Sequence, residues 1–68
     1  MDFAEALKAM KLGSKVSREA WRGKISYWWI HKRRGYENIH EVKPTGRTKV
    51  LAKIDAKDIV SDDWWIVT

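Results

Sequence analysis

The chain has 68 residues, with 14 Lys or Arg, 9 Asp or Glu, a formal net charge of +5 and no cysteine. This length allows one domain, residues 1–68. The absence of cysteine excludes disulfides and thiolate metal sites, and no apolar run approaches the ~20 residues needed to cross a bilayer. A domain this small, without disulfides, usually needs a partner subunit, so we expect a homo-oligomer. The positive charge favours an anionic partner, although a solvated basic surface is the alternative explanation.

Residues 3–12 predict an amphipathic helix. Asp2 and Glu5 have the spacing of a capping box, and Gly13 suits the left-handed position after the last turn. One face of this helix carries the apolar residues Phe3, Ala6, Leu7 and Met10. The acidic start of the chain differs from the basic start of a signal peptide, so we expect an intracellular protein.

The next segment predicts a short turn and a strand. Residues 17–21 have the composition of a single helical turn capped by Ser17. Residues 25–31 predict a strand with large apolar side chains on both faces, Tyr27 and Trp29 on one and Trp28 on the other. In so short a chain, we expect a second subunit to cover one of these faces.

The remainder predicts strands separated by turns. Residues 32–35 form a basic turn, and a short helix is expected over residues 55–60. Strands are expected at 39–43, 49–54 and 64–67. The predicted fold class is therefore α+β: a short N-terminal helix packed on a small, mainly antiparallel sheet, with a second short helix before the last strand.

Catalytic chemistry has no support in the residue pattern. Asp58, Asp62 and Asp63 form the one carboxylate cluster, and helix capping or turn formation accounts for them. His31 and His40 lack a set of further ligands or a paired nucleophile. We therefore expect no enzyme activity, no metal and no cofactor.

Tryptophan is the informative residue type, with five copies. Trp28–Trp29 and Trp64–Trp65 are adjacent pairs in predicted strands, so one member of each pair faces away from the core, toward a subunit interface or a stacked ligand. Trp21 lies among cations that suit a base with a phosphate, although plain core packing is the alternative. The candidate ligand-binding residues are Trp21, Arg22, Lys24, Arg18 and Trp65.

Two blocks of sequence resemble a known family. Residues 1–24 combine a short helix with Gly13-Ser-Lys-Val16, Arg18 and the turn Trp21-Arg-Gly-Lys24. Residues 58–64 read Asp-Ile-Val-Ser-Asp-Asp-Trp. Both blocks resemble the phage Thoeris anti-defence proteins of the second type, and together they cover about half of the chain.

The resemblance implies a sponge that sequesters a cyclic nucleotide immune signal without cleaving it. The ligands expected from the family are glycocyclic ADP-ribose isomers or cyclic dinucleotides, bound by a dimer or tetramer in the host cell cytoplasm. Two other functions remain open. One is direct inhibition of a bacterial defence complex, as anti-CRISPR proteins do. The other is a small basic nucleic-acid-binding module that uses Lys32, Arg33 and Arg34.

Overall fold

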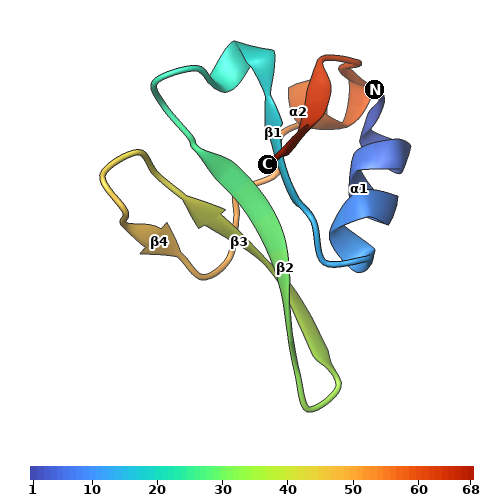
Figure 1. Ribbon diagram of the computed structural model, residues 1–68, viewed down its shortest axis with the longest axis vertical. Coiled ribbons are helices and arrows are strands. Elements are labelled where there is room, and N and C mark those ends of the chain that lie inside the picture. The colour runs from blue at the N-terminus through green and yellow to red at the C-terminus, as the bar shows by residue number, and fades with distance from the viewer.

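The computed structural model describes residues 1–68 and confirms the predicted α+β class. Five strands form one sheet in the order β4-β3-β2-β1-β5, and every neighbouring pair is antiparallel (Figure 1). In chain order the elements are α1 (Phe3–Lys11), β1 (Lys15–Arg18), the 3-10 turn η1 (Glu19–Trp21), β2 (Tyr27–Arg33), β3 (Tyr36–Val42), β4 (Thr48–Lys49), α2 (Ala56–Val60) and β5 (Trp64–Val67). None of the helices is long and apolar enough to span a membrane.

Helix α1 confirms the predicted caps. Glu5 N donates to Asp2 Oδ1 at 2.8 Å, and Asp2 N donates to Glu5 Oε1 at 3.2 Å, so the capping box is complete. The helix ends at Lys11, and Gly13 adopts a φ of 97°, a conformation that glycine tolerates best. The buried residues of α1 are Ala6 and Met10, on the apolar face that the sequence predicts.

The segment after α1 differs from the prediction. Ser17 does not cap a helical turn, because it lies inside β1, pairs with Trp65 of β5 and is buried. The turn begins two residues later, at Glu19, and its N-cap residue Arg18 makes no side-chain cap. The prediction was wrong here because β1 is held by pairing with β2 and with β5 at the far end of the chain, which a local sequence pattern does not reveal.

The β2–β3 hairpin is longer than predicted, and β4 is shorter. The hairpin turn consists of Arg34 and Gly35, which both have positive φ, at 45° and 85°. Two consecutive positive φ values are typical of the tight turns that match the strand twist. After Lys49 the chain leaves the sheet with one further backbone bond, from Ala52 N to Ile39 O at 2.9 Å, instead of forming a strand to residue 54.

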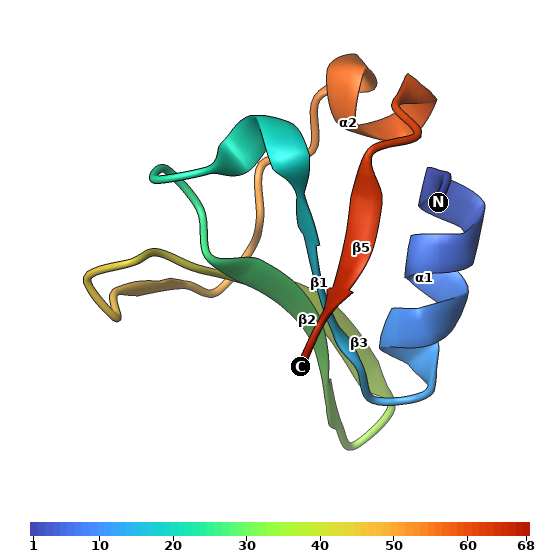
Figure 2. The same cartoon turned by 45° about the horizontal axis from the view of Figure 1, so that its top comes forward.

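One face of the sheet carries the core. Helix α1 lies on one side of the sheet, and α2 and η1 meet at one end of the molecule (Figures 1 and 2). Trp21, Trp28 and Trp64 pack together, with ring centroids 4.7–5.5 Å apart. The buried apolar residues are Ala6, Met10, Val16, Trp21, Trp28, Ile30 and Trp64. The opposite face, which bears Trp29 and Trp65, has no covering helix (Figure 1).

Candidate functional site

Arg18 organises the end of the molecule where η1 and α2 meet. Its Nη1 lies 2.7 Å from Asp58 Oδ1, and its Nε lies 2.8 Å from Asp63 Oδ1. Its Nη2 donates to Ser61 Oγ at 2.6 Å. The hydrogen bond with Asp63 raises the pKa of Arg18 above its usual value, against the opposing effect of burial. The guanidinium therefore joins β1 to α2 and β5.

Asp58 is a buried carboxylate with all of its oxygens occupied. Oδ1 accepts from Arg18 and from Trp21 Nε1, the latter at 3.3 Å, while Oδ2 accepts from Asp55 N at 3.1 Å. The main-chain oxygen accepts from Trp64 Nε1 at 2.9 Å. Asp58 thus caps the start of α2, as predicted, and also holds two core tryptophans in place.

A cavity of about 260 Å³ lies beside this network, between the η1 region and the segment that leads into α2. Three lysines on its wall, Lys24, Lys53 and Lys57, take part in none of the chain's salt bridges. Ile25 and Trp21 supply its apolar surface together with Ala20. The complete lining is Arg18, Ala20, Trp21, Lys24, Ile25, Lys53, Asp55, Lys57 and Asp58. The cavity therefore combines an apolar patch with an excess of cations, which suits a ligand with a planar base and an anionic group.

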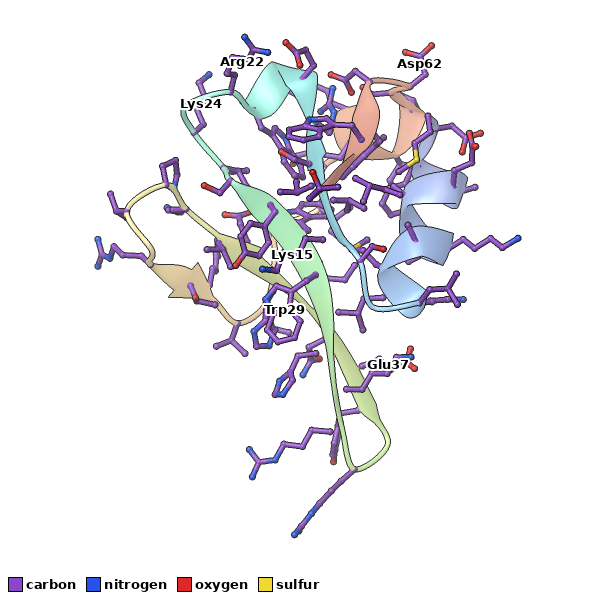
Figure 3. All side chains as sticks on the ribbon, in the orientation of Figure 1. Lys15, Arg22, Lys24, Trp29, Glu37 and Asp62 are labelled. Atoms are coloured by element: carbon purple, nitrogen blue, oxygen red, sulfur yellow. The ribbon has the colours of Figure 1, made fainter.

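Three of the five predicted ligand residues meet in this cavity: Arg18, Trp21 and Lys24. Arg22 lies outside it, because its side chain is 82% exposed and its Nη2 contacts Glu19 Oε1 at 2.8 Å. Figure 3 shows Arg22 and Lys24 on the loop after η1. Trp65 pairs with Ser17 in the sheet and is half exposed on the face without a helix. Ligand roles for all five residues stay predictions.

Trp21 belongs to the core as well as to the cavity. It is 7% exposed, and Trp28 and Trp64 pack against its ring. Little of its surface is therefore open for a base to stack on, so a bound ligand would contact its exposed margin. The sequence analysis missed Lys53 and Lys57, which lie four residues apart on either side of Asp55 and line the cavity only because the chain folds this segment against η1. The one signal in the sequence was that both lysines come just before the family-like block at residues 58–64.

A second, more open hollow of about 320 Å³ lies at the β3–β4 turn. Its lining residues are Lys43, Arg47, Thr48 and Lys49, and none of them is hydrophobic. Binding sites for small organic ligands are mostly apolar with a few polar groups. This hollow suits an anion alone, so the cavity beside Asp58 is the better candidate for a nucleotide.

Comparison with known proteins agrees with the resemblance in the two terminal blocks. The family model named Tad2-like, described as the Thoeris anti-defense 2-like domain, matches residues 1–67. No curated protein matches the chain. The family match spans every element that builds the cavity, including the middle segment that carries Lys53.

Proposed function

The chain belongs to the Thoeris anti-defense 2-like family, and we propose that it acts by sequestering a cyclic nucleotide immune signal in the cavity between η1 and α2. Membership of the family supports a role against the Thoeris defence system. The observation that supports the nucleotide is the set of three lysines without salt bridges around an apolar patch. The ammonium groups of these lysines can form ion pairs with the ligand's phosphates, while Ile25 and the exposed edge of Trp21 contact a base or ribose.

Binding without cleavage is part of the proposal. Asp58 is occupied by Arg18, Trp21 and the start of α2, so it is a poor candidate for a general base. Both histidines lie in β2 and β3 and are not among the residues that line the cavity. The lining of the cavity also contains no Ser, Thr, Cys or His, so it offers no hydroxyl, thiol or imidazole for nucleophilic catalysis.

The second part of the proposal is that the chain assembles into a homo-oligomer, as a dimer or tetramer. A cavity of about 260 Å³ is smaller than the roughly 300–1,000 Å³ of pockets that enclose drug-sized ligands. A cyclic nucleotide with two phosphates would therefore extend beyond it, and a second copy could complete the wall. Large exposed apolar side chains support such contacts. They are Leu12, Tyr36, Val50, Leu51, Ile54, Ile59, Val60, Trp65 and Ile66.

The site of action that follows is the cytoplasm of the host cell, where immune signals of this kind are made. The deciding experiment incubates the protein with a mixture of glycocyclic ADP-ribose isomers and cyclic dinucleotides, removes free ligand by filtration, and releases the bound fraction by heat. Mass spectrometry should recover one ligand with its original mass. Recovery of a linear product would contradict sequestration, and recovery of no nucleotide would contradict nucleotide binding.

Oligomer formation is tested separately by light scattering. The protomer mass is 8.0 kDa, so a scattering mass of at least twice that value is expected. Trp65→Glu should lower this mass if the face without a helix is the contact surface, whereas Lys8→Glu on the solvent side of α1 should not. A monomer at micromolar concentration would contradict this part of the proposal while leaving ligand recovery to be judged on its own.

Nucleic-acid binding is the second candidate, because both hairpin turns carry exposed cations. Arg33 and Arg34 lie at the β2–β3 turn, and Lys43, Arg47 and Lys49 surround the β3–β4 hollow. Binding to a phosphate backbone weakens steeply with salt, by orders of magnitude for several contacts. Titration of a short duplex at low and moderate salt therefore separates this candidate from a small-ligand cavity.

A further inference from the structure

The β2–β3 hairpin brings the two histidines of the chain together. In the strand register Trp29 is paired with His40 and His31 with Asn38, so His31 and His40 lie diagonally on one face. Their ring centroids are 5.0 Å apart. Trp29 completes the cluster, at 5.3 Å from His31 and 5.2 Å from His40.

This cluster lies on the face without a helix. Trp29 and Lys15 both project on the side away from α1 in Figure 3. The Lys15 ammonium lies 4.8 Å from the centre of the Tyr27 ring and so is already engaged. Both imidazoles are half-buried, and neither takes part in a side-chain hydrogen bond. Every fully buried side-chain nitrogen in the chain has a hydrogen-bond partner, so the unpaired imidazole nitrogens are accessible to solvent.

The spacing of the two rings matches a chelate. Imidazole nitrogens bind Zn²⁺ at about 2.0–2.1 Å, so two rings on one ion at angles of roughly 90–110° have centroids roughly 4.5–5.2 Å apart. The observed 5.0 Å lies within that range. We propose that His31 and His40 chelate a divalent late transition-metal ion, of the Zn²⁺, Ni²⁺ or Cu²⁺ class, on the open face of the sheet.

The class of ion follows from the donors. Imidazole suits zinc, nickel and copper, whereas calcium and magnesium require oxygen ligands. No group of three or more possible ligands surrounds the pair, so one protomer supplies two positions and water fills the others. If two copies meet through this face, two pairs could share one ion with four nitrogens. The site is thus an open chelate, which differs from a closed structural zinc site with four protein ligands.

The test is calorimetric titration of the untagged chain with ZnCl₂ and NiCl₂. Saturable binding is expected, with one ion per protomer, or one per two protomers if pairs share an ion. His31→Ala and His40→Ala should each weaken binding by roughly 100-fold or more, because loss of one arm removes the chelate. Asn38→Ala is the matched control, since it changes the neighbour of His31 on the same face and leaves both rings.

Fluorescence gives an independent readout. Ni²⁺ bound between the two rings should quench Trp29, and Trp29→Phe should remove most of that quenching while calorimetric binding persists. Circular dichroism establishes that each variant is folded, and His31→Gln and His40→Gln replace any alanine variant that is not. The proposal is overturned if the parent shows no saturation below about 1 mM ion. It is equally overturned if both single-histidine variants bind like the parent, since packing with Trp29 would then account for the cluster.

Discussion

Asp63 Oδ1 accepts a hydrogen bond from Arg18 Nε at 2.8 Å, and this contact joins two residues that are 45 positions apart in the chain. The other oxygen of the same carboxylate accepts from Ala20 N at 3.1 Å, and the Asp63 carbonyl accepts from Glu19 N at 3.1 Å. Asp63 therefore fixes the start of η1 against β5. The position of η1 in turn sets where Trp21 and Lys24 meet the cavity.

Acid should weaken the fold through Asp63. The hydrogen bond from Arg18 lowers the pKa of this carboxyl below its usual value, against the opposing effect of burial. Because the unfolded chain then takes up this proton more readily, the stabilisation is complete above about pH 5 and is lost as the pH falls through the folded pKa. Thermal melts from pH 7 to pH 2.5 should show a falling Tm, and Asp63→Asn should melt lower at pH 7. An equal pH dependence in both proteins would contradict the assignment to Asp63.

Removal of Arg18 should be costly because it leaves buried acidic charge. The side chains of Arg18 and Asp58 are 10% and 8% exposed, so Arg18→Ala would leave the Asp58 carboxylate without its cation. Breaking such a pair typically costs about 3–5 kcal/mol. Denaturant unfolding of the parent, Arg18→Ala, Asp58→Ala and the double variant measures the coupling. If the double variant loses the sum of the two single losses, the two side chains are not coupled.

The local signals in the sequence were sufficient for α1, α2 and β5. Helix caps such as Asp2 with Glu5 and the apolar periodicity of α1 act within one or two turns, so a single sequence reveals them. Strand β1 was missed because Lys15–Arg18 has one apolar residue, and its pairing partners lie in β2 and at the end of the chain. Strand β4 was predicted too long because apolar composition at residues 50–54 does not require sheet pairing.

The candidate site follows the same rule: residues that are close in sequence could be predicted, and residues brought in by distant contacts could not. Arg18, Trp21 and Lys24 are close in sequence, so their meeting follows from one short turn. Lys53 and Lys57 reach the cavity because Asp58 pairs with Arg18, which is a contact between distant segments. The sequence explained Asp58 as a helix cap, and that explanation was correct but incomplete, because one carboxylate both caps α2 and pairs with the guanidinium.

Trp21→Ala should primarily destabilise the domain. The side chain is 7% exposed and packs against Trp28 and Trp64, so its truncation should cost about 3–5 kcal/mol of folding free energy. Trp21→Phe keeps most of the packing and removes the bond from Nε1 to Asp58, at a cost of about 1 kcal/mol for the lost bond. Thermal melting of both variants checks this order. Parent-like melting of Trp21→Ala would contradict a core role.

Lys24 and Arg22 form a matched pair for testing the cavity. They flank Gly23 in the same loop, both are exposed, and only Lys24 lines the cavity. Lys24→Ala should therefore weaken the binding of the recovered nucleotide by about 1.5–3 kcal/mol, the usual contribution of a hydrogen bond to a charged group, with little change in Tm. Arg22→Ala should have a smaller effect, because its guanidinium already contacts Glu19. Calorimetric titration measures both affinities, with Lys8→Ala on α1 as a control for net charge.

Equal losses of affinity for Lys24→Ala and Arg22→Ala would show that the ligand extends past the cavity onto the outside of the loop. Equal losses for all three variants would show that overall charge, and not this cavity, determines the affinity.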